Sequence, residues 1–278
     1  MKSRTLIALV IISFPVLFFA SDGIRYAQHQ VGRLYLNGKW ITQDYKEAEK
    51  WFRRAAQQGY SRANYALGIM YYKGNGVTRD YKEAVKWYRL AADQGMKEAQ
   101  VYLGVMYDEG NGVTRDHKEA VKWYRLAAEQ GLKEAQVNLG QMYYNGQGAT
   151  KDYKEAVKWF RLAAEQGYAP GQVNLGNMYY NGHGVTEDYK EAMKWFRFAA
   201  EQGYATAQSN LGMMYDSGYG APKDIVYAHM WWNLAASNGE TEAGTNRDVV
   251  AKKMTPTQIE KAQQLARECV KKNYKNCD

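Results

Sequence analysis

The sequence has few of the residues on which metal sites and many catalytic sites are built. Its 278 residues include two cysteines, four histidines and four prolines. The cysteines, Cys269 and Cys277, both lie near the end of the chain, and the histidines are scattered. There is no HExxH pattern and no glycine loop followed by the Lys and Ser or Thr that grip a phosphate. The sequence therefore indicates no catalytic residue, no metal and no cofactor, and we expect a protein that is not an enzyme.

Long apolar runs are absent after the first twenty residues. Residues 1–20 have a short basic start, Lys2 and Arg4, and then an apolar run from Leu6 to Ala20, which is the layout of a secretory signal peptide. As a helix the run would cover roughly 22 Å, less than the ~30 Å hydrocarbon core of a bilayer. Phe18 is bulky where a cleavage site favours a small residue, so an uncleaved anchor is the alternative. We predict a periplasmic or secreted protein with no membrane span in its mature chain.

What the chain does have is aromatic residues and glycine. The 24 tyrosines and 8 tryptophans are too many aromatic residues for a disordered chain, and the 26 glycines indicate many turns. The formal charge of +8 is modest, and a positive excess of this size is typical of a solvated basic face. Because export also argues against nucleic acid as a partner, we expect none.

A 36-residue repeat dominates the sequence, and such a period indicates an array of helical hairpins. Six tryptophans follow it: Trp51, Trp87, Trp123, Trp159, Trp195 and Trp231. The stretch DYKEAVKWFRLAAEQGY, residues 152–168, has Asp152 as a helix N-cap, Glu155 to complete a capping box and Gly167 as a left-handed stop. Its apolar residues fill more than half of the helix circumference, so each copy must pack against its neighbours.

The other half of each repeat also has helical spacing. In KEAQVNLGQMYYNGQGAT, residues 133–150, Gly140 would let a partner helix approach closely. Each repeat is thus a helix A, a glycine loop and a helix B, with the repeated tryptophans of helix B in the core. The predicted pairs cover residues 25–58, 61–93, 97–129, 133–165, 169–201 and 205–237.

The period fails after Gly239, and we predict three parts: a signal peptide over 1–20, six repeats over 21–239 and a C-terminal cap over 240–278. In the cap, Thr255, Pro256 and Gln258 begin an amphipathic helix with a capping box. An oxidising compartment and an even cysteine count favour a Cys269–Cys277 disulfide. Two free thiols or an intermolecular link are the alternatives.

The repeat resembles the Sel-one-like repeat, a relative of the tetratricopeptide repeat. The resemblance rests on A-x-x-x-L-G-x-M-Y-x-x-G-x-G-V followed by D-Y-x-E-A-x-x-W-x-x-x-A-A-x-Q-G, and it covers about residues 24–239. It implies an all-α, right-handed α/α solenoid of six helix-turn-helix repeats whose A helices line a concave groove. It also implies a scaffold, which we expect to be a monomer, that binds a protein or peptide partner.

If the A helices line the groove, neutral amides follow it, with tyrosines beside them. The predicted groove residues are Asn138, Gln141, Tyr144, Asn145, Asn174, Asn177, Tyr180, Asn181 and Asn210. Amides can donate to and accept from an extended peptide backbone. Related tetratricopeptide modules hold a peptide carboxylate with Asn plus Lys or Arg, but the cationic partners are missing here and only Arg62 is basic at the matching place. A neutral extended segment is therefore the predicted ligand, and bonding of these amides to loops or water is the alternative.

A periplasmic hydrolase of β-lactam or cell-wall amides is the rival function, because some exported members of the family have been linked to such chemistry. That chemistry needs an activated serine, as in S-x-x-K. Ser61, Ser209, Ser217 and Ser237 each lack a lysine three residues later, so the sequence favours the scaffold.

Overall fold

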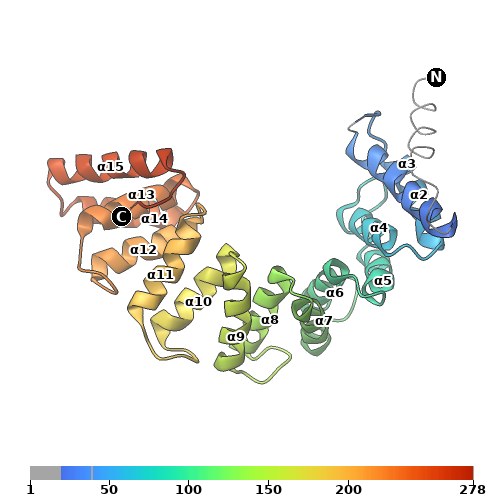
Figure 1. Ribbon diagram of the computed structural model, residues 1–278, viewed down its shortest axis with the longest axis horizontal. Coiled ribbons are helices and arrows are strands. Elements are labelled where there is room, and N and C mark those ends of the chain that lie inside the picture. Colours follow the sequence, from blue (N-terminus) through green and yellow to red (C-terminus); the bar gives the residue numbers. More distant parts are fainter. Residues whose placement is uncertain (1–19, 39, 278) are drawn as a thin grey trace. The chain divides into compact units, whose positions relative to one another are not determined.

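The computed structural model describes residues 20–38 and 40–277, which form helices and no strand (Figure 1). The first of two compact units ends at Gln130 and holds α2 (Ala20–Asn37), α3 (Tyr45–Gln57), α4 (Ser61–Lys73), α5 (Tyr81–Ala92), α6 (Lys97–Glu109) and α7 (His117–Glu129). The second begins at Gly131 and holds α8 (Lys133–Asn145), α9 (Tyr153–Glu165), α10 (Ala169–Asn181), α11 (Tyr189–Ala200), α12 (Ala205–Ser217), α13 (Ile225–Ser237), α14 (Thr241–Ala251) and α15 (Pro256–Lys271). Apart from Ala20, the predicted signal peptide lies outside the described residues.

Each repeat is a hairpin in which an A helix packs on the B helix that follows it. In the second unit α8, α10 and α12 are A helices, and α9, α11 and α13 are their B helices. B helices also pack on the next A helix, as α9 does on α10 and α11 on α12. The helices begin and end within a few residues of the predicted pairs. The predicted all-α solenoid is therefore confirmed.

The N-caps of the B helices form as predicted, but the capping box does not. Oδ1 of Asp152 accepts the N–H groups of Lys154 and Glu155 at 2.9 and 3.1 Å. The N–H of Asp152, which Glu155 would have to bind, instead donates to the carbonyl of Tyr143 at 3.0 Å. This backbone bond ties the start of α9 to α8, so it replaces the local bond that the sequence pattern suggests.

Gly140 sets the close approach of α8 and α9. A Cβ atom at Gly140 would lie 2.6 Å from the ring of Phe160, which is well inside the distance at which two carbon atoms pack. Phe160 is fully buried there. The predicted close approach is confirmed, and it explains why glycine stands at this helical position.

The repeated tryptophans lie either in the core or at its edge. Trp231 is fully buried, and Trp123 and Trp159 are each 6% exposed. The other three are only half-buried: Trp51, Trp87 and Trp195. A cation of the same helix covers the ring of some of them, since Nζ of Lys194 lies 5.7 Å from the ring centroid of Trp195. The tryptophan row therefore marks the outer limit of the core as well as its interior.

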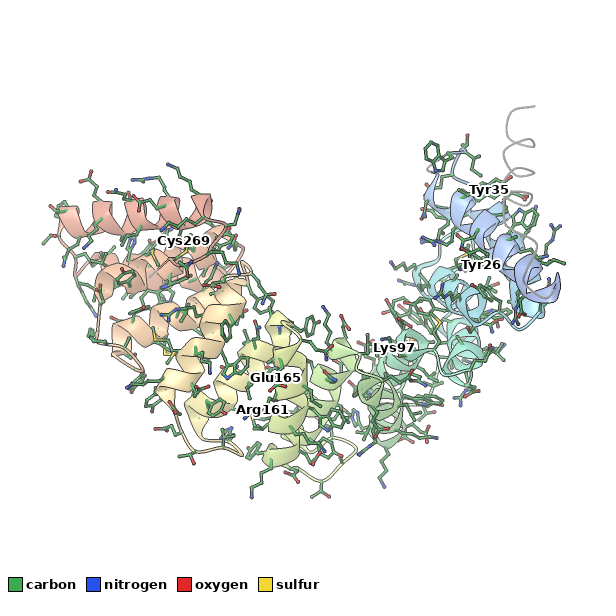
Figure 2. All side chains as sticks on the ribbon, viewed as in Figure 1. Tyr26, Tyr35, Lys97, Arg161, Glu165 and Cys269 are labelled. Carbon is green, nitrogen blue, oxygen red and sulfur yellow. A yellow bond between two sulfur atoms is a disulfide. The ribbon has the colours of Figure 1, made fainter. Side chains whose placement is uncertain are left out.

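Arginine side chains of the B helices join successive repeats. Arg161 of α9 (Figure 2) donates to the hydroxyl of Tyr179 in α10 at 2.8 Å. Arg197 of α11 donates to Tyr215 in α12 at 3.3 Å. Each bond spans 18 residues and crosses from one repeat to the next, so the repeats share polar as well as apolar contacts.

The C-terminal cap contains one helix more than predicted. Sequence analysis identified α15, and the complete capping box of Thr255 and Gln258 is present. It missed α14, because that helix buries only Ala243 and Val250 and has little amphipathic pattern. α14 and α15 both pack on α13, so the array closes with two helices.

The two cysteines lie together in this cap. Cys269 is buried on α15 (Figure 2) and forms a disulfide with Cys277, with their Cα atoms 5.0 Å apart. The tail between them turns back onto the last repeats. Its Tyr274 hydroxyl donates to Oδ1 of Asn238 at 3.1 Å, and Lys275 lies 3.4 Å from the carboxylate of Glu201. The pairing expected from the sequence is therefore present in the structure.

Candidate peptide-binding surface of the A helices

Three asparagines occupy the same position of α8, α10 and α12, and we call them the amide row: Asn138, Asn174 and Asn210. All three are half-buried. Among the described residues, none forms a hydrogen bond with their side-chain amides. Each amide therefore keeps its two N–H donors and its carbonyl acceptor for another molecule.

A pocket of about 190 Å³ opens beside the amide row between α8 and α10. Its walls carry five of the nine predicted groove residues: Gln141, Tyr144, Asn174, Asn177 and Asn181. Phe160 and Met178 also line it and, at most 2% exposed, form its buried floor. The pocket thus combines amide groups with a small apolar floor, which suits a side chain carried by an extended backbone.

Some predicted groove residues already have partners within the protein. Nε2 of Gln141 donates to Oδ1 of Asn145 at 3.1 Å, and Nδ2 of Asn145 donates to Oε1 of Gln147 at 3.0 Å. Nδ2 of Asn181 donates to the carbonyl of Asn177 at 2.8 Å. Asn145 and Asn181 are exposed at helix ends, so for these two residues the local role suggested as the alternative applies.

Tyr144 and Tyr180 lie in aromatic clusters that support the glycine loops. The ring of Tyr144 lies 5.2 Å from that of Tyr153 and 5.8 Å from that of His183. Tyr180 packs against Tyr189 at 5.4 Å, and its hydroxyl donates to Sδ of Met213 in α12 at 3.6 Å. Burial raises the pKa of Tyr180 above its ordinary value, so it stays neutral. These tyrosines form apolar walls next to the amide row.

The sequence reasoning did not identify a second, buried row of amides. Gln100, Gln136, Gln172 and Gln208 recur every 36 residues and are at most 5% exposed. Oε1 of Gln172 accepts from Nε2 of Gln202 at 2.8 Å, and its Nε2 donates to the carbonyl of Ala164 at 3.3 Å. These glutamines stabilise the array and are not accessible. Their fixed period was the signal that could have found them.

The three asparagines of the amide row all lie in the second unit. In the first unit the matching positions of α6 and α4 hold Tyr102 and Ala66, and that of α2 holds Gln30. The ring of Tyr102 stacks on that of Tyr88 at 5.1 Å. The two units therefore offer different chemistry on their A helices.

Lysines on the outer face of the B helices form a basic stripe. They are exposed, and some form ion pairs with acidic residues of the same helix. Lys154 and Lys158 are both exposed, and Nζ of Lys158 lies 3.4 Å from the carboxylate of Glu155. Such surface ion pairs add little to stability. These lysines therefore form a solvated basic face of the kind that the modest positive charge of the chain indicates.

The described residues also bear on metal binding, membrane insertion and serine chemistry. Within the described part of the chain, no three histidine, cysteine, aspartate or glutamate side chains gather as metal ligands would. None of the helices described has the length and apolar character to cross a membrane. Of the serines considered for the hydrolase, Ser237 donates to the helix carbonyl of Asn233 at 2.9 Å. No feature of the described residues favours the hydrolase.

Hairpins of two helices stacked at a 36-residue period define an α/α solenoid of the tetratricopeptide-like class. The family model described as Sel1 repeat matches residues 25–60, 61–96, 97–132, 133–168, 169–204 and 205–240. The chain belongs to the Sel1 repeat family. Sel1 repeat solenoids are protein-interaction scaffolds and are typically non-catalytic.

Two of the solved structures that are similar to this chain share at least 32% of its sequence. One is a protective antigen of uropathogenic Escherichia coli strains that displays an SLR fold: it is 38% identical over 93% of this chain, with a TM-score of 0.81. The chain spans 56% of the length of that protein. The other is a Sel1 repeat protein from Oxalobacter formigenes, 32% identical over 84% of this chain and 92% of its own, with a TM-score of 0.71. No curated protein sequence matches the chain.

Proposed function

We propose that the protein is an exported scaffold that binds an extended, uncharged segment of a protein or peptide across α8, α10 and α12. The observation that carries this proposal is the amide row, whose three side chains have no partner among the described residues. Membership of the Sel1 repeat family supports the scaffold role.

The chemistry of the surface supports an uncharged extended ligand. A side-chain amide can donate to a peptide carbonyl and accept from a peptide N–H at the same time. The pocket between α8 and α10 has no charged residue in its lining, so a charged ligand side chain would lose its hydration there without gaining an ion pair. An uncharged ligand side chain avoids this cost.

Export rests on two features of the chain. The basic and apolar segment over residues 1–20 has the layout of a signal peptide. The Cys269–Cys277 disulfide is a bond that persists in oxidising compartments such as the periplasm. Fractionation of cells that express the untagged protein tests this part, with recovery in the periplasm or medium as the expected result.

Peptides selected from a random library on the immobilised protein supply probes for the binding proposal. Calorimetry then compares the wild-type protein with the variant Asn138→Ala, Asn174→Ala, Asn210→Ala. A hydrogen bond contributes ~0.5–1.5 kcal/mol, so the loss of three should weaken binding by about tenfold or more. The matched control replaces three exposed amides elsewhere, Gln57→Ala, Asn246→Ala and Gln263→Ala, and should bind as the wild type does.

The melting curve of the amide-row variant separates the two outcomes that count against the proposal. If binding and melting both stay at wild-type values, the ligand lies on another face. If the melting temperature falls sharply, the asparagines support the array and not a ligand.

A further inference from the structure

The outer face of α11 carries an exposed apolar residue next to two exposed lysines. Phe198 is 43% exposed, and Lys194 and Lys190 stand one and two helical turns before it, on the same side of the helix. The ring of Trp195, which is half-buried, meets that of Phe198 edge to face with 5.6 Å between centroids. We call these four residues the outer strip of α11. Its aromatic pair is apolar surface whose burial under a partner would be favourable.

The strip recurs at the 36-residue period on three other B helices, α5, α7 and α9. The apolar residue there is leucine, between 38% and 49% exposed, and two exposed lysines stand one and two turns before it. The three leucines are Leu90, Leu126 and Leu162. Side chains this exposed add little to the packing of their own hairpins, so the pattern calls for another role.

In α13, the last B helix, the same positions are apolar and buried. Met230 and Leu234 stand where Lys194 and Phe198 stand in α11, and they are 0% and 2% exposed. Trp231, between them, is fully buried. Part of the protein therefore covers on α13 the face that is open on α11.

The helix that covers this face of α13 is α15. α9 and α11 each pack on the A helices before and after them, and α14 takes the place of the following A helix for α13, because it begins 36 residues after α12. α13 packs on α15 as well (Figure 1), whereas α14 and α15 have few contacts with each other. Met230 and Leu234 share one apolar core with Ala266 and Cys269 of α15. The protein thus shows that an amphipathic helix fits the outer face of a B helix.

The layer that α15 forms also reaches the end of α11. Glu201 comes three residues after Phe198, and its carboxylate lies 3.4 Å from Lys275 in the tail that follows α15. Phe198 stays exposed beside this contact. A second helix docked along α11 would therefore continue an interface that the cap begins.

The charges show how such a helix must differ from α15. Lys190 and Lys194 stand where α13 has Val226 and Met230. The ammonium group of Lys190 has no partner among the described residues, and Lys194 forms an exposed ion pair with Glu191 of its own helix at 3.0 Å. A helix on α11 therefore needs acidic residues opposite the two lysines.

An anionic membrane is the other occupant that would use lysines and an apolar residue together. Exposed carboxylates lie in the same region, however: Glu187 and Asp188 come just before Lys190, and in α9 Glu165 follows Leu162. A continuous anionic surface would meet these carboxylates as well as the lysines, and like charges repel. A helix can place its acidic residues opposite the lysines alone, so the mixed charge favours a helix.

We propose that the outer strip of α11, like its copies on α5, α7 and α9, docks an amphipathic helix of a partner protein. Apolar side chains of that helix pack on Phe198 and Trp195. Acidic side chains one and two turns further along pair with Lys194 and Lys190. This docking surface is separate from the amide row, which lies on the A helices.

A variant of the full chain that keeps one strip makes the test simple. Leu90→Ser, Leu126→Ser and Leu162→Ser remove the leucines from α5, α7 and α9 and leave the outer strip of α11. Because these side chains are exposed, the melting temperature should stay close to that of the wild type. The probe is a labelled helical peptide of 16 residues, the length of α15, with leucine and alanine on one face and two glutamates one and two turns beyond them. Its twin has glutamine in place of both glutamates.

Fluorescence anisotropy should show saturable binding of the glutamate peptide by the one-strip protein and by the wild type. The glutamine twin should bind about fivefold more weakly, and added salt should reduce this difference. Phe198→Ser in the one-strip protein should weaken binding of both peptides by about tenfold or more. Lys190→Gln with Lys194→Gln should remove the difference between the peptides.

Matched controls change exposed positions away from the strip. Val249→Ser alters a valine of α14 that is 50% exposed, and Lys252→Gln with Lys253→Gln removes two exposed lysines. Neither control should change the binding of either peptide. The amide-row variant should also bind the glutamate peptide as the wild type does, so this proposal and the proposed function can fail separately.

Several results would overturn the proposal. One is no binding of either peptide by the wild type, and another is binding that survives Phe198→Ser in the one-strip protein. Equal affinity for the two peptides would show that the lysines do not select acidic residues. Sedimentation with vesicles of phosphatidylglycerol and phosphatidylcholine, lost in Phe198→Ser, would assign the strip to a membrane. A dimer in sedimentation velocity that Phe198→Ser dissociates would assign it to a second copy of the chain.

Discussion

Gln172 donates from Nε2 to the main-chain carbonyl of Ala164, 3.3 Å away, across the junction between the fourth and fifth repeats. Its Oε1 accepts from Nε2 of Gln202 at 2.8 Å, so one buried amide joins α9, α10 and the turn after α11. The same arrangement occurs in the first unit, where Gln100 accepts from Gln130 and donates to Ala92. Successive repeats are thus held by a satisfied polar contact as well as by apolar packing.

Replacing Gln172 with leucine should destabilise the protein. The change keeps a side chain of similar length but leaves the carbonyl of Ala164 and the amide of Gln202 without that partner. An unsatisfied buried group costs ~1–3 kcal/mol, and a loss of this size should appear in the free energy of unfolding from urea titration. The control Gln263→Leu, at an exposed position of α15, should change it little. A Gln172→Leu protein as stable as the wild type would show that the contact contributes nothing.

At Asn64 of α4, which occupies the position of Gln100 and Gln172, a substitution can add the missing contact instead of removing it. Asn64 is one methylene shorter than glutamine, and its buried Oδ1 has no partner. Gln94, which stands where Gln130 and Gln202 stand, donates only to the carbonyl of Leu90 in its own helix, at 2.9 Å. Asn64→Gln should bring Oε1 within reach of Gln94 and stabilise the protein by about 1 kcal/mol. A lower free energy of unfolding would mean that the site has no room for the longer side chain.

Much of this architecture could be predicted from the sequence, because the residues that begin, end and space the helices recur in several copies of the repeat. Asp152, Gly140 and Gly167 act within one hairpin, so their neighbours along the chain are enough to interpret them. The pocket between α8 and α10 is different, since Phe160 and Met178 come from different helices and line one pocket only in the folded array. α14 was missed for another reason: its few buried side chains leave almost no periodic pattern.

The stability of the first unit should depend on pH through His29. Burial, together with the positive charges of Arg33 and Arg62, lowers the pKa of His29 from 6.5 to about 4. Because the folded-state pKa lies below the unfolded value, the unfolded chain takes up a proton first as the pH falls. The contribution of His29 is therefore complete above pH 6.5 and is lost between pH 6.5 and about 4, by at most ~3 kcal/mol.

Urea unfolding at a series of pH values measures this loss. His29→Phe cannot take up a proton and should flatten the profile between pH 6.5 and 4. Part of the slope should remain, because burial and Arg247 also lower the pKa of His229 in the second unit. A wild-type profile with the same slope as that of His29→Phe would show that His29 keeps its ordinary pKa.

The Cys269–Cys277 disulfide should stabilise the cap and little else. It closes a loop across 8 residues of sequence, and a loop this short constrains little of the unfolded chain, so reduction should cost ~3 kcal/mol or less. Reduction should also free Tyr274 and Lys275 from Asn238 and Glu201, which limited proteolysis of the tail would detect. Thiol titration of the unreduced, denatured protein should find no free thiol. Two titratable thiols would remove both the bridge and its support for export.

The most direct test of the central claim, that α8, α10 and α12 bind an extended segment, is a nuclear magnetic resonance titration of the side-chain amides. The protein is labelled with ¹⁵N, and a peptide selected on it is added. The amide signals of Asn138, Asn174 and Asn210 should shift together and saturate, whereas those of the exposed Gln57 and Asn246 should stay in place. If the peptide binds while the three amide-row signals do not move, the account is wrong about where this scaffold takes its ligand.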